Sequence, residues 1–173
     1  MQYTKIMRER LSAGDPEFEL DPQLRVQAPQ IKAALAFWTA KRGDRPMPTR
    51  DQFSLRETLG FAPHLQLLDL QDNGNAYRQR LTGTAIVAQL KTDPTGQIFD
   101  AASTDPVVHR MLQAVRWVIA NRKPLRTVAH RTALAGQDFM KHETLFLPLS
   151  SDGSALDMLA VVSDFSAASA PAR

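Results

Sequence analysis

The feature that most constrains the fold is the run of residues 65–165, in which segments with strand character lie on both sides of one long amphipathic helix. Residues 65–70 and 77–82 are apolar or alternating, as expected for strands. Between them, the polar and glycine-containing residues 72–75 are typical of a hairpin turn. These segments therefore predict an antiparallel pair of strands before the helix.

The helix is predicted by its start and by its apolar stripe. Asp105 provides an acidic cap, and Pro106 is favoured at the first helical position. Val108, Leu112, Val115 and Ile119 recur at the spacing of one helix face. We expect this helix to end before Pro124 and to cover one face of a sheet.

Three more strands are predicted after the helix. They are residues 126–134, 139–149 and 156–165, and the turns between them lie at residues 135–138 and 151–153. Two strands, a helical insert and three strands predict an α+β fold. We expect a five-stranded antiparallel sheet, with the insert between strands 2 and 3 and a further helix at the N-terminal side.

The strand of residues 139–149 is apolar on both faces, because Leu145 and Leu147 alternate with Phe146. The inserted helix can cover only one of these faces. The other face requires either the helix predicted around Ile31 and Trp38 or a partner subunit.

Three regions are expected along the chain. Residues 1–28 contain Pro16, Pro22 and little periodicity, which predicts an irregular N-terminal arm. Residues 29–166 are expected to form one domain that includes the N-terminal helix. Residues 167–173, rich in alanine, are expected to be a disordered tail.

Composition excludes several classes of site and partner. The chain has no cysteine, which excludes disulfides, thiolate metal sites and a cysteinyl flavin adduct. The net charge of +3 comes from scattered basic residues, so we do not expect nucleic-acid binding. No apolar segment is long enough to cross a membrane, and we expect a cytoplasmic protein.

The order of elements and several short motifs resemble those of a bacterial single-domain PAS-like family. The similarity covers roughly residues 30–165. The motifs are Phe37-Trp38, RGDRPMPTR (42–50), Leu67-Leu68-Asp69, YRQRLTGT (77–84), Asp93-Pro94-Thr95-Gly96 and ETLFLPL (143–149). The resemblance implies a curled sheet with a pocket between its inner face and the inserted helices. It implies a scaffold more firmly than a function.

His130 and Glu143 are the first candidate pair of site residues. If residues 135–138 form a four-residue turn, the two side chains lie opposite each other on neighbouring strands, about 5 Å apart at Cβ. They are either a polar anchor in a ligand pocket or an ordinary cross-strand pair.

Further candidates are expected at a ligand site and at an interface. Arg80 either binds an anionic ligand group or forms a salt bridge with Asp69. The remaining ligand-contact candidates are Tyr77, Met111 and Val115, and the interface candidates are Phe37, Trp38 and Phe146.

Neither a cofactor nor a metal is required by the sequence. His109 lies on the long helix, which carries the haem ligand in haem-binding PAS sensors. It is off the apolar stripe, however, and we expect a surface histidine. The four histidines and the lack of cysteine give no zinc motif.

The favoured hypothesis is a stand-alone PAS-type sensor or adaptor, not an enzyme. It binds a small molecule or a protein partner, signals by association and forms a homodimer. One alternative is a small enzyme of the cone-shaped α+β fold in which an aspartate or glutamate acts together with a histidine. Another is a purely structural interaction protein whose N-terminal arm wraps around a neighbour.

Overall fold

The computed structural model describes residues 17–131 and 140–167. The predicted turn at residues 135–138 and most of the predicted tail lie outside these ranges, as do the first 16 residues of the predicted arm. Within the described residues, no helix is long and apolar enough to span a membrane.

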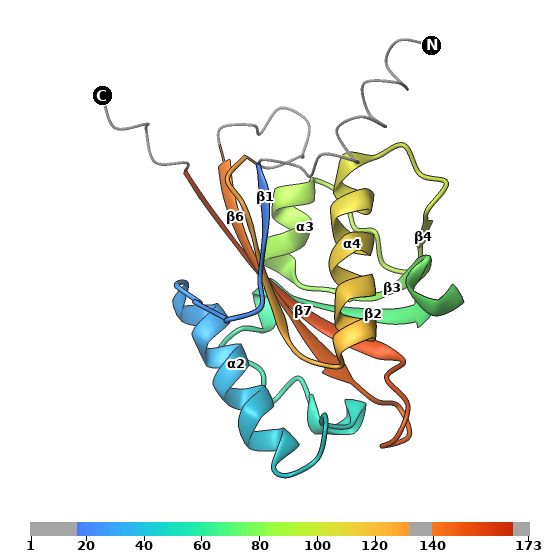
Figure 1. Ribbon diagram of the computed structural model, residues 1–173. Coiled ribbons are helices and arrows are strands. Elements are labelled where there is room, and N and C mark those ends of the chain that lie inside the picture. The colour runs from blue at the N-terminus through green and yellow to red at the C-terminus, as the bar shows by residue number, and fades with distance from the viewer. Residues whose placement is uncertain (1–16, 132–139, 168–173) are drawn as a thin grey trace.

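One antiparallel sheet forms the centre of the molecule (Figure 1). Its strand order is β1-β5-β6-β7-β2-β3-β4. The strands are β1 (Phe18–Asp21), β2 (Leu65–Gln71), β3 (Ala76–Thr82), β4 (Ile98–Asp100), β5 (Leu125–Ala129), β6 (Met140–Leu149) and β7 (Met158–Ala167). The helices are α2 (Pro29–Arg42), α3 (Thr84–Leu90) and α4 (Pro106–Asn121), and there are three single-turn 3-10 helices, Arg50–Gln52, Ala62–His64 and Asp72–Gly74.

The sheet has seven strands, so the prediction of five was too low. The two additional strands, β1 and β4, are four and three residues long and form the edges of the sheet. Such short segments show no measurable alternation, and they become strands by pairing with β5 and β3. As a result, part of the predicted irregular arm is a strand, and β4 interrupts the predicted helical insert.

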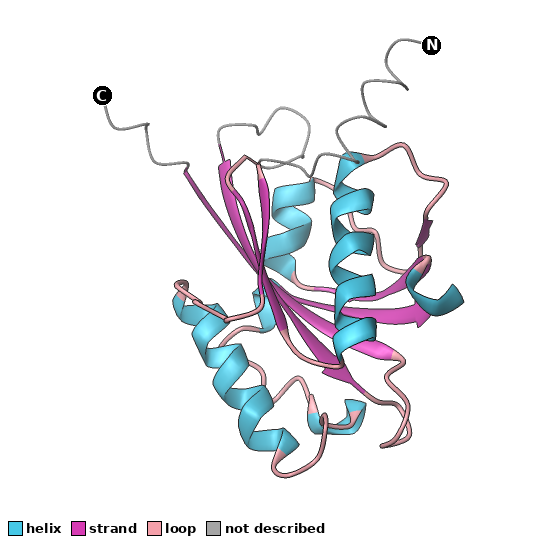
Figure 2. Cartoon of the chain, viewed as in Figure 1, coloured by secondary structure: helices cyan, strands magenta, loops and turns pink. Residues whose placement is uncertain are grey.

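Helices cover both faces of the sheet. Figure 2 shows the long strands β6 and β7 running diagonally between α2 on one side and α3 with α4 on the other. We call the α2 side the outer face and the α3/α4 side the inner face. Ile31, Ala34 and Trp38 of α2 are buried against outer-face side chains such as Leu145 and Leu147. The N-terminal helix is therefore the cover that the second apolar face requires.

The long helix α4 begins and ends as the sequence predicts. The Asp105 carboxylate accepts a hydrogen bond from the Val107 backbone N–H at 2.8 Å, which caps the first turn. At the other end, Arg122 adopts a left-handed conformation before Pro124. The stripe that includes Leu112 and Val115 is buried against the inner face.

Candidate functional site

A cavity of about 300 Å³ lies between the inner face of the sheet and the helices α3 and α4. It is placed beside the inner core, where apolar residues of α4 pack on Phe146 and Val161. The residues that line it come from every strand of the sheet, from α3 and α4 and from the loops around β4: Phe18, Gln66, Tyr77, Gln79, Ile86, Leu90, Thr92, Pro94, Gln97, Phe99, Asp105, Val107, Val108, Arg110, Met111, Thr127, Ala129, His142, Thr144, Phe146, Ser163 and Phe165.

The sheet side of the cavity is formed by a row of uncharged polar side chains. Thr127, Thr144 and Ser163 are aligned on β5, β6 and β7 by the strand register. Gln66 and Gln79 continue the row on β2 and β3. We call these five residues the polar row. They are smaller or more polar than the apolar residues of the inner core, which leaves room and hydrogen-bonding groups between the sheet and the helices α3 and α4.

Hydrogen bonds hold much of the polar row in place. Thr144 Oγ1 lies 3.1 Å from Ser163 Oγ and 2.7 Å from His142 Nε2. Gln79 Nε2 donates to Gln66 Oε1 at 2.9 Å and also contacts the Leu81 carbonyl oxygen at 3.1 Å. Because a carbonyl oxygen can only accept, this contact determines which side of the Gln79 amide carries its nitrogen. The Gln79 Oε1 atom is therefore left on the other side of the amide.

His142 is an uncharged member of the cavity wall. Its ring stacks on Phe165, with the ring centroids 4.2 Å apart. Burial lowers the pKa of His142 to about 4, and the nearby Arg110 cation acts in the same direction. The imidazole is therefore neutral at physiological pH.

Tyr77, one of the predicted ligand-contact residues, forms another part of the wall. It is 4% exposed, and its ring stacks on Phe99 at a centroid distance of 5.3 Å. Burial raises the pKa of the Tyr77 hydroxyl, and Asp105 adds to this effect. The phenol therefore stays protonated and able to donate a hydrogen bond.

The predicted contact between His130 and Glu143 does not form. Glu143 lies opposite Val128 in the β5–β6 ladder, two residues from the expected register. His130 is exposed and contacts Glu19, with 3.4 Å between Nε2 and Oε2. A shift of two residues keeps each side chain on its face of the sheet, so the apolar pattern could not reveal it.

Glu143 instead fastens the start of α2 to the outer face. It accepts hydrogen bonds from the backbone N–H groups of Gln27 and Ala28 at 2.8 and 3.0 Å and from Arg126 Nε at 2.8 Å. Arg126 Nη1 also donates to Asp21 at 2.9 Å. Burial raises the pKa of Glu143, but these hydrogen bonds outweigh burial and the net pKa is lowered. Glu143 is therefore a charged anchor on the side opposite the cavity.

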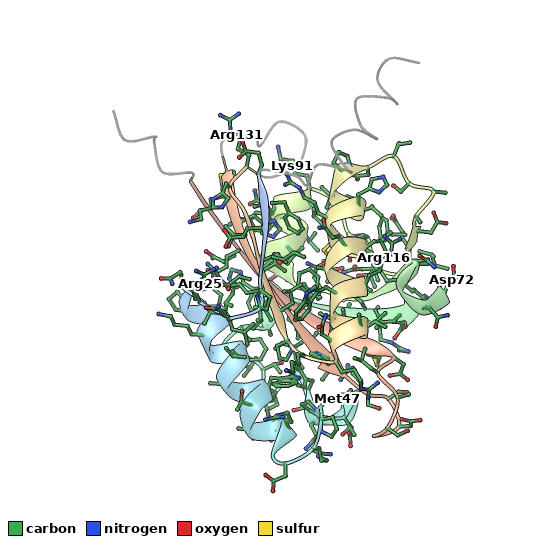
Figure 3. The ribbon with its side chains drawn as sticks, in the orientation of Figure 1. Arg25, Met47, Asp72, Lys91, Arg116 and Arg131 are labelled. Carbon is green, nitrogen blue, oxygen red and sulfur yellow. The ribbon has the colours of Figure 1, made fainter. Side chains whose placement is uncertain are left out.

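The other predicted ligand residues lie in different places. Met111 lines the cavity, whereas Val115 is fully buried in the inner core and is not among the lining residues. Arg80 is exposed and forms an ion pair with Asp69 at 2.9 Å, as the alternative interpretation proposed. Figure 3 shows the charged side chains Arg25 and Lys91 on opposite sides of the sheet.

The predicted interface residues have packing roles within the chain. Trp38 is 4% exposed and donates from Nε1 to the Pro148 carbonyl oxygen at 2.8 Å. Phe37 packs edge-on against Phe53 and Phe61. Phe146 is 1% exposed and contributes to the cavity wall.

The sequence prediction missed His142 and the polar row. His142 precedes Glu143, so strand alternation places the two side chains on opposite faces of the sheet. The prediction chose Glu143, whose side chain lies on the outer face, away from the cavity. Thr127, Thr144 and Ser163 are individually unremarkable. Only the register of three strands brings them together.

Possible metal ligands and His109, which the sequence predicts to be a surface histidine rather than a haem ligand, lie as follows. In the described part of the chain, no three His, Asp or Glu side chains are grouped so that they could hold a metal ion. His109 is half-buried on α4 and does not line the cavity.

The structure is thus an α+β domain whose antiparallel sheet and helices surround a partly open cavity. A family model described as the PAS domain matches residues 26–163. The chain therefore belongs to the PAS domain family, as the sequence motifs indicated. No curated protein and no solved structure gave a significant match.

Proposed function

We propose that this PAS domain is a sensory module that binds a small molecule in the cavity between the polar row and the helices α3 and α4. The observation that carries the proposal is the cavity itself, about 300 Å³ in volume, with apolar walls and a few polar groups on one side. Binding sites for small molecules have this composition and begin at about this size. The pair of residues considered for the enzyme alternative, His130 and Glu143, does not converge, and His130 does not line the cavity.

The signal is proposed to pass to a protein partner or to a second copy of the chain. Trp38 and Phe146 are buried and offer no surface for this contact. The exposed large apolar residues Leu55, Leu59 and Ile98 provide accessible apolar surface. Size-exclusion chromatography with light scattering measures the association, and a monomer both with and without ligand would contradict this part of the proposal.

Filling the cavity tests the proposed binding. Met111→Trp adds a large ring to the cavity wall, whereas Gln113→Trp adds the same ring to the exposed side of the same helix. We expect native mass spectrometry to detect a bound small molecule on the wild type and on Gln113→Trp, but not on Met111→Trp. Circular dichroism confirms that both variants fold. A molecule retained by folded Met111→Trp would show that the cavity is not the site.

A further inference from the structure

Several polar atoms at the cavity have no hydrogen-bond partner among the described residues. Tyr77, Gln79 and Thr127 are at most 4% exposed and all three line the cavity. Within residues 17–131 and 140–167, no hydrogen bond is made by the Tyr77 hydroxyl, Gln79 Oε1 or the Thr127 hydroxyl. In these residues Arg42 Nε is the one fully buried side-chain nitrogen or oxygen atom without a partner, so the three atoms at the cavity are open to its interior. They are therefore available to pair with water or with a polar group of a ligand.

His142 adds one more available atom. Its Nε2 atom is used by Thr144, and Nδ1 has no partner among the described residues. In the neutral imidazole, Nδ1 donates or accepts according to the tautomer. Together with two hydroxyl groups and one amide oxygen, the cavity can pair with both a donor and an acceptor on one ligand.

None of these atoms carries a charge. The two charged residues that line the cavity, Asp105 and Arg110, have opposite signs and bind protein backbone instead. Asp105 accepts from the Val107 N–H at 2.8 Å, and Arg110 donates to the Arg131 carbonyl oxygen at 2.8 Å. Because Asp105 and Arg110 have opposite signs, the lining carries no net charge that would favour an ionic ligand group, and burying such a group against the uncharged polar row is costly. The lining therefore favours an uncharged ligand.

The size and the aromatic content of the cavity restrict the ligand further. A volume of about 300 Å³ corresponds to about ten water molecules, or a ligand of about 10–15 non-hydrogen atoms. Five of the lining residues carry aromatic rings, which pack well against a flat ring. They are Phe18, Tyr77, Phe99, Phe146 and Phe165.

From these observations we infer that the cavity binds a small, flat, uncharged molecule that carries both a hydrogen-bond donor and an acceptor, such as an aromatic amide or a neutral heterocycle. The inference rests on the proposed function, because it specifies the ligand of the same cavity. The Tyr77 hydroxyl, Thr127 hydroxyl, Gln79 Oε1 and His142 Nδ1 are its polar contacts.

Three probes that share one ring system test the inference by isothermal titration calorimetry at pH 7.5. Indole-3-acetamide is neutral, indole-3-acetate is an anion and tryptamine is a cation. We expect the amide to bind about tenfold or more tightly than either ion, because an ion loses its hydration against the uncharged polar row and the lining has no net charge to compensate for this loss. An ion that binds as tightly as the amide would overturn the inferred ligand class and leave the proposed function standing. If none of the three binds, the inferred ligand class fails, whereas the proposed function fails only if native mass spectrometry also detects no small molecule that is lost in Met111→Trp.

Two single-group deletions test the polar contacts. Tyr77→Phe and Thr127→Val each remove one hydroxyl with almost no change in shape, and we expect each to weaken binding of the amide by about two- to tenfold. The melting temperature without ligand should stay the same or rise, because neither hydroxyl has a protein partner. Thr39→Val is the control for affinity, because it removes a hydroxyl at an exposed position of α2, outside the cavity, where the hydroxyl donates to the Leu35 carbonyl oxygen. It should leave the affinity for the amide unchanged. Unchanged affinity in both cavity variants, or a lower melting temperature in the absence of ligand, would assign the hydroxyls a structural role and overturn the inferred contacts.

Discussion

His142 illustrates how the fold changes the chemistry of a single residue. Its neighbour Glu143 keeps its charge on the outer face, while His142 lines the cavity on the inner face. Burial, assisted by the Arg110 cation, lowers the pKa of His142 from 6.5 to about 4. The imidazole is thus a neutral hydrogen-bonding group, as a site for an uncharged ligand requires.

This pKa shift predicts how stability depends on pH. Between pH 6.5 and about 4, the unfolded chain binds a proton at residue 142 that the folded chain does not bind. The free energy of unfolding should therefore fall as the pH decreases through this window. In His142→Phe, which keeps an aromatic ring beside Phe165, this contribution is absent and the decrease should be smaller. Urea unfolding at several pH values measures the free energy of unfolding of both proteins and its dependence on pH.

The exposed His130 provides the control for this experiment. His130→Gln alters a surface side chain outside the cavity and should retain the pH dependence of the wild type. If His142→Phe also retained the pH dependence of the wild type, the neutral state assigned to His142 would be wrong.

At the scale of elements, the anchor formed by Glu143 connects α2 to the sheet. The Glu143 carboxylate accepts hydrogen bonds from two backbone N–H groups at the start of α2 and from the buried Arg126 side chain. Ala28, the residue before the helix, provides no side-chain cap of its own. The carboxylate of a distant strand thus takes the place of the local cap that most helices use.

Replacing this carboxylate should loosen the contact between α2 and the sheet. In Glu143→Gln, Arg126 loses a charged partner in a buried position, and we expect the free energy of unfolding to fall by about 2–4 kcal/mol. Glu57→Gln breaks an exposed ion pair with Lys41 and should have little effect. Chemical denaturation measures the free energy of unfolding of Glu143→Gln and of Glu57→Gln. Equal and small effects would show that Glu143 does not anchor α2.

The elements also show where sequence patterns stop being informative. The apolar stripe and caps of α4 and the alternation of β6 are local properties, and they predicted these elements correctly. The pairing of β5 with β6 depends on the geometry of the connection, and a two-residue shift leaves the faces unchanged. For this reason, the sequence assigned Glu143 to the correct strand and to the wrong partner.

At the scale of the whole molecule, the two faces of the sheet have different structural roles. The outer face is covered by α2 and carries the charged anchor. Part of the inner face is apolar and packs against α4, and the part that carries the polar row forms the wall of the cavity. The need to cover both faces was evident from the apolar residues of 139–149. The polar row was not, because its five residues meet only when five strands are aligned.

The central claim is that a ligand occupies the cavity on the inner face, and isoleucine methyl NMR tests its position most directly. Ile86 of α3 lines the cavity, whereas Ile31 of α2 is fully buried on the outer face. Addition of indole-3-acetamide should shift the δ1-methyl signal of Ile86 and leave that of Ile31 unchanged. A shift at Ile31 without one at Ile86 would contradict the claim, as would the absence of any shift at saturating amide.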